Sequence, residues 1–170
     1  MNIDLSSFQD ETVISISLEG KLEKNNLNIN GRKIRFMEPI EYKGQIYRVG
    51  KDKQLHLDIN YKYEEECGRC LEPFVREEST VLSGKLVEDV GGDCEDEEEE
   101  LIYHTGDKLN LDKYIMDMVV LSLPMKPLCN VGCKGLCPKC GVNQNKKDCD
   151  CDVEDVDPRL AILKDFFPEE

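Results

Sequence analysis

The sequence predicts an α+β fold: a mostly antiparallel β domain with one core helix, a small cysteine-rich module near the C-terminus, and a terminal helix. The 170 residues include 23 Val and Ile but one Ala and no Trp, which favours strands over a helical bundle. Several segments alternate apolar and polar residues with the period of two that is typical of a half-buried strand. Six of the nine cysteines lie between Cys129 and Cys151.

The chain is acidic, with 36 Asp and Glu against 22 Lys and Arg and a formal net charge of −14. This balance argues against free-standing nucleic-acid binding, because affinity for a duplex depends largely on cations that neutralise phosphates. No apolar run is long enough to predict a membrane-spanning helix. The first ten residues have no basic head and no apolar stretch, so no export signal is expected. We therefore expect a cytoplasmic chain with reduced thiols that serve metal or redox chemistry rather than a disulfide framework.

Four segments are predicted to form strands. Residues 12–19 and 54–66 alternate with period two. The segment 34–47 is interrupted by Pro39 and Gly44, which predicts short strands and turns.

A turn is expected at Cys67-Gly-Arg-Cys70, at the end of the second alternating segment. Residues 71–88 are then predicted to return as the fourth strand. Its inward anchors are expected to be Phe74, Val81 and Leu86.

Two helices are predicted in the second half of the chain. The first, 110–123, is capped by Asn110 and ends before Pro124. Its apolar stripe, spaced for one helical face, consists of Leu111, Ile115, Met118, Val119 and Ser122. The second helix, 158–167, begins at Asp157-Pro158, a cap followed by Pro at the first helical position.

These elements predict three parts. Residues 1–127 form the mostly β domain, which contains an acidic loop at 91–100 and the helix 110–123. Residues 128–152 form the cysteine-rich module, and 153–170 form a tail with the short helix. Seven of the eight residues 93–100 are acidic, which predicts a solvated connector, or alternatively an arm that docks a basic protein or mimics nucleic acid.

The cysteine-rich module has the spacing of a zinc site. Zn²⁺ prefers four ligands in a tetrahedron, and thiolates are among the ligands that it favours. Cys137-Pro-Lys-Cys140-Gly is a tight knuckle whose last residue can take a positive φ. Cys149 and Cys151, two apart in an extended segment, point to the same side. We predict one structural Zn²⁺, with no open position for catalysis.

Six cysteines compete for the four positions: Cys129, Cys133, Cys137, Cys140, Cys149 and Cys151. Cys129 and Cys133 lie at i and i+4 and could replace the last pair if their segment were helical. The other pair, Cys67 and Cys70, is expected to be a turn with two buried thiols, although it could act as a redox dithiol or join a second site.

Four lysines and no acid lie within residues 129–147: Lys134, Lys139, Lys146 and Lys147. A small basic surface of this kind could contact RNA or an acidic partner, although ordinary surface lysines around a zinc loop are the simpler interpretation. The sequence contains no phosphate-binding glycine motif and no nucleophile elbow, and its two histidines form no catalytic constellation. We therefore expect a protein that is not an enzyme and that has no small-molecule substrate.

Several of these segments together resemble one family. Cys67-Gly-Arg-Cys70-Leu-Glu-Pro-Phe74, the run Leu121-Ser-Leu-Pro-Met-Lys-Pro-Leu-Cys129, the run from Cys133 to Asn143 and the tail Asp157-Pro-Arg-Leu resemble the YceD family of large ribosomal RNA subunit accumulation proteins. With its six-cysteine insert, the chain is similar to the zinc-bearing type of Gram-positive bacteria.

The resemblance implies a cytoplasmic bacterial factor in the synthesis, processing or stability of large-subunit ribosomal RNA. Its expected partners are a ribosomal precursor or ribosomal protein, with possible RNA contact through the zinc module, and it assigns no catalytic residue. Two other classes remain open. A redox-switched zinc chaperone also combines C-x-C with C-x-x-C, and a zinc-stabilised protein-interaction module would need no ribosomal partner.

Overall fold

The computed structural model describes residues 2–10, 12–89 and 101–151. The predicted acidic loop and the predicted helix 158–167 lie outside these residues. The described elements are β1 (Asn2–Asp4), the 3-10 helix η1 (Ser6–Gln9), β2 (Ser15–Leu22), β3 (Asn26–Ile29), β4 (Arg32–Phe36), β5 (Ile40–Val49), β6 (Asp52–Glu66), β7 (Pro73–Glu88), β8 (Leu101–His104), β9 (Lys108–Asn110) and α1 (Asp112–Ser122).

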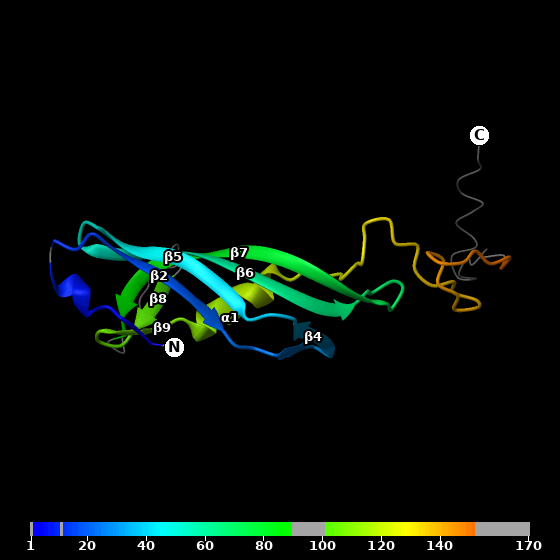
Figure 1. Cartoon of the computed structure of the whole chain (residues 1–170), viewed down its shortest axis with the longest axis horizontal. Coiled ribbons are helices and arrows are strands. Elements are labelled where there is room, and N and C mark those ends of the chain that lie inside the picture. Colours follow the sequence, from blue (N-terminus) through cyan, green and yellow to red (C-terminus); the bar gives the residue numbers. More distant parts are fainter. Residues whose placement is uncertain (1, 11, 90–100, 152–170) are drawn as a thin grey trace, which may run out of the picture.

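Seven of the strands form one long twisted sheet (Figure 1). β2, β5, β6, β7 and β8 are neighbours in that order, and β4 pairs with the last part of β6 and carries β3. Every pair in this sheet is antiparallel except β7 and β8. β1 and β9 form a separate antiparallel ribbon. The predicted α+β class and its mostly antiparallel sheet are therefore confirmed.

β6 is the central strand, and its alternation produces the core. Leu55, Leu57, Ile59, Tyr61 and Tyr63 are all buried, whereas most of the residues between them face solvent. Burial of one face only is the usual pattern of an antiparallel sheet that packs on one side.

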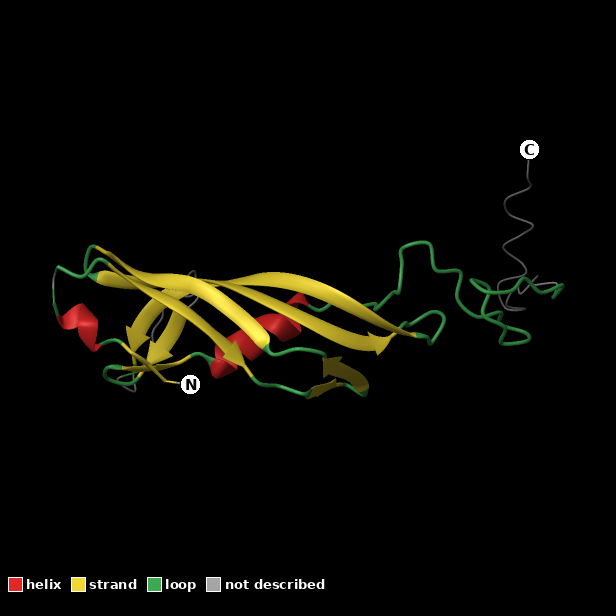
Figure 2. Ribbon diagram, in the orientation of Figure 1, coloured by secondary structure: helices red, strands yellow, loops and turns green. Residues whose placement is uncertain are grey.

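The single described α-helix, α1, lies across the buried face of the sheet (Figure 2). Leu111, Ile115 and Val119 are buried there at the predicted spacing. The side chain of Asn110 accepts a hydrogen bond of 2.9 Å from the amide of Asp112, and the chain becomes extended at Leu123, before Pro124. No helix within the described ranges is both long and apolar enough to cross a membrane.

Two details differ from the predictions. Gly44 does not interrupt the segment 34–47 but lies inside β5, opposite Leu57 of β6. Val81 is exposed, and Leu82 is the buried residue of β7 at that level. A strand directs alternate side chains to one face, so Val81 could not share the inward face with Leu86, five positions along.

A buried ion pair joins the end of β6 to β4. Glu65 is 3% exposed, and its carboxylate accepts hydrogen bonds of 2.7 and 3.0 Å from the guanidinium of Arg32. Arg32 also donates to the carbonyl oxygen of Pro124, just after α1. This one side chain therefore connects β4, β6 and the chain that leaves the helix.

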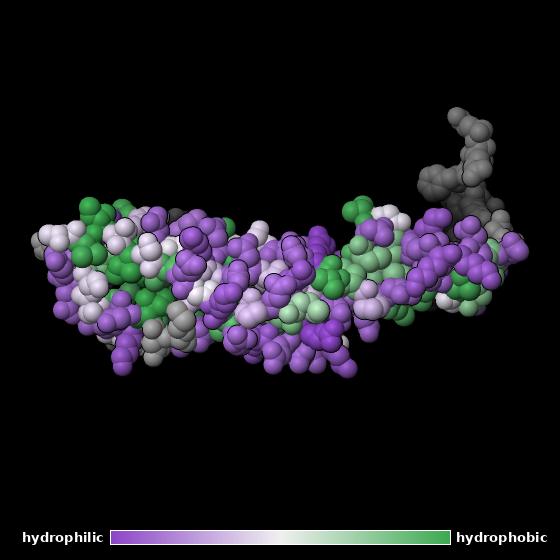
Figure 3. Space-filling model, in the orientation of Figure 1, coloured by the Kyte–Doolittle hydropathy of each residue, from purple (hydrophilic) through white to green (hydrophobic). Residues whose placement is uncertain are grey.

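The cysteine-rich segment lies at one end of the elongated molecule. After α1 the chain passes beyond the tip of the β6–β7 hairpin, at the end opposite to the β5–β6 turn (Figure 1). The space-filling view shows a mostly hydrophilic surface, with apolar areas at the far end of the sheet and between the body of the sheet and this end (Figure 3).

Candidate metal centres

The eight cysteines of the described residues form two groups of four. In each group the sulfur atoms all lie within 4.8 Å of one another. The hairpin cluster consists of Cys67, Cys70, Cys129 and Cys133. The terminal cluster consists of Cys137, Cys140, Cys149 and Cys151.

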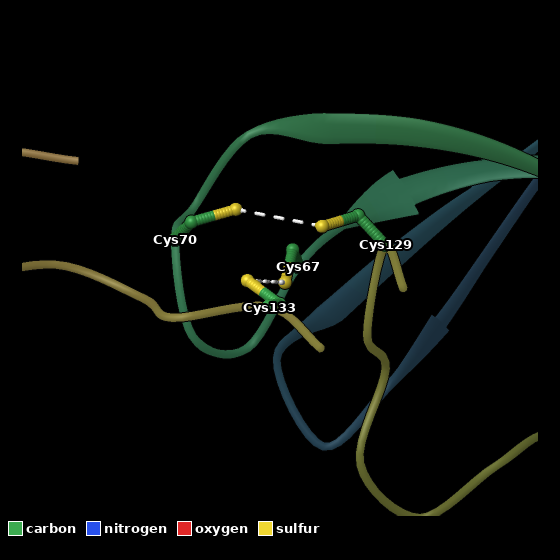
Figure 4. A group of neighbouring side chains, drawn as sticks. All are labelled: Cys67, Cys70, Cys129 and Cys133. Carbon is green, nitrogen blue, oxygen red and sulfur yellow. Dashed lines mark hydrogen bonds between the residues drawn. The ribbon is translucent and has the colours of Figure 1, made fainter. Parts of the chain in front are cut away.

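The hairpin cluster joins two distant parts of the chain. Cys67 and Cys70 come from the turn between β6 and β7, whereas Cys129 and Cys133 come from the segment after α1, and the side chains point toward one another (Figure 4). The sulfur atoms of Cys67 and Cys133 are 3.8 Å apart, as are those of Cys70 and Cys129. Three of these residues are buried and form a small core of their own, separate from that of the sheet.

Backbone hydrogen bonds hold these two parts together. The amide of Gly68 donates to the carbonyl oxygen of Pro127 at 2.8 Å, and the amide of Leu136 donates to that of Arg69 at 3.2 Å. The Arg69 guanidinium donates to the carbonyl oxygen of Cys133 at 2.8 Å. The turn and the later segment are thus fixed to each other by polar contacts as well as by their cysteines.

The terminal cluster is local in sequence. Its first pair forms a knuckle, in which the amide of Cys137 donates to the carbonyl oxygen of Val142 and the amide of Gly141 donates back to that of Cys137. Gly141 has a φ of 73°, a conformation that glycine adopts without a steric penalty. Cys149 and Cys151 lie beside this knuckle, and Cys140 is the exposed member.

Each cluster contains one cysteine whose pKa is below the ordinary value for a thiol and one whose pKa is above it. Burial opposes ionisation of Cys67, but backbone amides of Cys70, Cys129 and Arg69 donate to its sulfur and lower its pKa to about 6. Burial and the neighbouring thiols raise the pKa of Cys129 to about 12.

The terminal cluster shows the same division. Backbone amides of Cys140 and Lys139 lower the pKa of Cys137 to about 6, while the thiol of Cys140 and burial raise that of Cys151 to about 12. Four thiolates at such close range repel one another. A bound cation would offset this repulsion and allow all four thiols to ionise.

The grouping differs from the sequence-based expectation of one site among six cysteines. Cys129 and Cys133 do not compete with Cys149 and Cys151, because the structure places them against the turn of the β6–β7 hairpin. The sequence-based interpretation did not place that turn in a group with Cys129 and Cys133. The available signal was its C-x-x-C spacing, which repeats that of the terminal knuckle.

The four lysines of residues 129–147 are all exposed. Lys146 forms an ion pair of 2.7 Å with Glu72, the last residue before β7. This ion pair lowers the pKa of Glu72. Lys134, Lys139 and Lys147 are exposed at the same end of the molecule, as are Asp148 and Asp150.

The body of the molecule carries acidic side chains in a shallow groove. The groove runs along β6 and β7 and is lined by Glu38, Glu41, Glu77 and Glu78. Lys62 forms ion pairs with Glu38 and Glu77 there, while Lys21 pairs with Glu41 and Arg76 with Glu78, so each of the four carboxylates has a cationic partner.

Known proteins match much of this chain. The family model described as "Large ribosomal RNA subunit accumulation protein YceD" matches residues 55–167, a range that contains both clusters. "Large ribosomal RNA subunit accumulation protein YCED homolog 1, chloroplastic" of Arabidopsis thaliana is 39% identical over 56 residues, 33% of this chain and 17% of that protein. An uncharacterized protein of Mycobacterium tuberculosis is 36% identical over 107 residues, 62% of this chain and 51% of that protein.

The chain thus spans about half or less of the length of these curated relatives. No solved structure matches it.

Proposed function

We propose, because the chain belongs to the YceD family of large ribosomal RNA subunit accumulation proteins, that it is a non-enzymatic accessory factor in the synthesis, processing or stability of large-subunit ribosomal RNA. The factor acts by binding, in the cytoplasm of a bacterial cell. The observation that carries this proposal is the family match over residues 55–167, which covers the cysteine-rich end together with α1, β7, β8 and most of β6.

Two groups of charged side chains could contact a ribosomal precursor. The exposed lysines around the clusters could meet phosphates of RNA, whose affinity for a protein depends on such cations. The carboxylates that line the groove along β6 and β7 could bind a basic ribosomal protein. Opposite charges on the two partners would favour the association and its orientation.

The terminal cluster would bind one Zn²⁺ in a structural role. Its donors are Cys137, Cys140, Cys149 and Cys151, which form the preferred tetrathiolate set and leave no position for a reacting water. The ion would hold residues 137–151 in the conformation that presents Lys139 and its neighbours to RNA.

Depletion of the protein tests the function. Mature large-subunit RNA should fall relative to small-subunit RNA, and precursors should accumulate. A normal level and ratio of both RNAs after depletion would contradict the proposal.

Co-sedimentation tests the mode of action. The purified protein should travel with ribosomal precursors at low salt and dissociate as salt rises, because phosphate contacts release counterions. The variant Lys134→Gln/Lys139→Gln should bind more weakly, and the slope of its salt dependence should fall by about one for each phosphate that the protein no longer neutralises. Lys24→Gln/Lys51→Gln, which removes the same charge from exposed sites elsewhere, is the matched control. Equal weakening in both variants would argue against RNA binding at the cysteine-rich end.

A further inference from the structure

We propose that the hairpin cluster is a second structural zinc site, whose ion joins the β6–β7 turn to the segment after α1. The protein would then carry two Zn²⁺ ions rather than one. This inference rests on the geometry around Cys67, Cys70, Cys129 and Cys133, and it holds whether or not the protein acts on ribosomal RNA.

The sulfur separations have the dimensions of a tetrathiolate site. A regular tetrahedron with metal–sulfur bonds of about 2.3 Å has edges of about 3.8 Å between its sulfur atoms. In the structure the sulfur atoms of Cys67 and Cys133, and those of Cys70 and Cys129, are 3.8 Å apart. A disulfide would require about 2.05 Å, so the four thiols are spaced for a shared ion rather than for bonds to one another.

The hairpin turn also repeats the backbone of the terminal knuckle. In the turn the amide of Cys67 donates to the carbonyl oxygen of Glu72, five residues on, and the amide of Leu71 donates back to that of Cys67. These are the same two hydrogen bonds that join Cys137 to Val142 and Gly141 to Cys137. The two C-x-x-C segments therefore share one conformation, which directs both sulfurs of each pair to one side.

The shared conformation is costly in the hairpin turn. Leu71 occupies the position of Gly141 and has a φ of 57°, a left-handed conformation that disfavours a side chain by about 1 kcal/mol. Because Leu71 is 61% exposed, burial of its side chain does not offset this cost. An ion held by the neighbouring cysteines would supply the stabilisation that keeps the turn in this form.

Two amide side chains donate to the sulfur atoms of the cluster. Asn145 Nδ2 lies 3.3 Å from Cys133 Sγ, and Asn130 Nδ2 lies 3.6 Å from Cys129 Sγ. Donors of this kind stabilise negative charge on metal-bound sulfur and orient the ligands. Asn145 belongs to the loop between the two halves of the terminal cluster, so this loop contributes a donor to the hairpin cluster.

Metal analysis of the full-length protein, purified with reductant, tests the proposal. We expect two zinc ions per chain in the unmodified protein. Cys67→Ser/Cys70→Ser and Cys137→Ser/Cys140→Ser, which each remove one C-x-x-C pair, should each retain one ion. One zinc per chain in the unmodified protein, iron in place of zinc, or two ions in Cys67→Ser/Cys70→Ser would overturn it.

Cobalt titration of the unmodified chain is independent of whether the variants fold. After removal of metal under reducing conditions, we expect the visible bands of tetrahedral thiolate-bound Co²⁺ to rise until two equivalents have been added. Saturation at one equivalent would overturn the second site. Neither measurement involves ribosomes, so a normal RNA level on depletion would leave the two-ion result intact.

The rates of zinc release should distinguish the two sites. Cys67, Cys70 and Cys133 are each at most 4% exposed, whereas the terminal cluster includes the exposed Cys140. A chelator with a colorimetric readout should therefore remove zinc in a fast and a slow phase of equal size. The slow phase should be absent from Cys67→Ser/Cys70→Ser and retained in Cys137→Ser/Cys140→Ser. Loss of the fast phase from the hairpin variant would contradict the assignment.

Discussion

The side chain of Glu65 carries a charge inside the protein, and the guanidinium of Arg32 is its counterion. The carboxylate is 1% exposed, whereas the Arg32 side chain is 25% exposed and also bonds to the carbonyl oxygen after α1. A neighbouring pair, Arg35 with Glu64, has a similar distance of 3.0 Å but lies at the surface. A comparison of the two pairs therefore separates the effect of burial on stability from the effect of losing one positive charge.

Replacement of Arg32 by Ala should destabilise the protein by about 3 kcal/mol, because it leaves a buried carboxylate without its partner. Arg35→Ala should cost less than about 1 kcal/mol, since its pair is exposed to water. Urea unfolding followed by circular dichroism measures both. Similar shifts of the two midpoints would show that burial of Glu65 is not decisive.

Leu71 and Gly141 occupy the same position of the two knuckles and permit a reciprocal test. A Cβ at Gly141 would contact nothing within 4 Å, so Gly141→Ala introduces only the left-handed strain of about 1 kcal/mol. This should weaken zinc binding at the terminal cluster by roughly fivefold, as measured by chelator competition. Leu71→Gly relieves the strain but adds freedom to the unfolded chain, so it should leave zinc binding at the hairpin cluster unchanged or slightly tighter. A tenfold weakening of zinc binding in Leu71→Gly would contradict a shared knuckle conformation.

At the scale of elements, β5 approaches β6 too closely for a side chain at Gly44. A Cβ there would overlap with the carbonyl oxygen of His56 and would lie 2.8 Å from the Cα of Leu57. Backbone atoms cannot move aside without a change in the strand pairing. The glycine that sequence reasoning assigned to a turn is thus required inside the strand.

Gly44→Ala should therefore destabilise the sheet by about 1–3 kcal/mol, in the range of other overpacked cores. The thermal midpoint should fall by about 2–4 °C for each kcal/mol in a protein of this size. Lys43→Ala, at the adjacent exposed position, is the control and should leave the midpoint nearly unchanged. An unchanged midpoint in Gly44→Ala would mean that β5 can shift relative to β6 at little cost.

The elements differ in how far the sequence predicts them. The long strand at 54–66 and the helix at 110–123 follow from strict periodicity, and the structure places β6 and α1 there with changes of a few residues. The inward face of β7 was harder to predict, because most of that strand is not fully buried and the adjacent Val81 and Leu82 are both apolar. β3 and β4 are short, and only their pairing with each other and with β6 defines them.

In the candidate site, contacts between cysteines close in sequence could be predicted, whereas contacts between distant cysteines could not. Cys137 and Cys140 belong with Cys149 and Cys151 through spacing that is visible in the sequence. Cys67 meets Cys133 only because the β6–β7 hairpin and α1 end at the same place, and their sequence separation is 66 residues. Proximity over that range depends on the tertiary fold, which spacing alone does not specify.

For the molecule as a whole, the separate cores of the sheet and of the hairpin cluster predict independent responses to metal removal. A strong chelator should expose the amides of Leu136, Cys137 and Gln144 to rapid hydrogen exchange, because their hydrogen bonds lie in the cysteine-rich end. Amides in the β5–β6 ladder should keep their protection. Exchange mass spectrometry measures both regions in one sample. Loss of protection in the ladder would show that the sheet itself depends on metal.

The distance along the chain between the two halves of the hairpin cluster also orders the events of folding. The thiols of the terminal cluster span 14 positions, from Cys137 to Cys151, and can meet as soon as that segment exists. Cys70 and Cys129 are 59 positions apart, and closing the larger loop costs about 1 kcal/mol more in chain entropy. In the folded protein β7 and α1, placed against the sheet, bring these two cysteines together and so offset that cost. Formation of the hairpin cluster is therefore coupled to folding of the body, whereas formation of the terminal cluster is not.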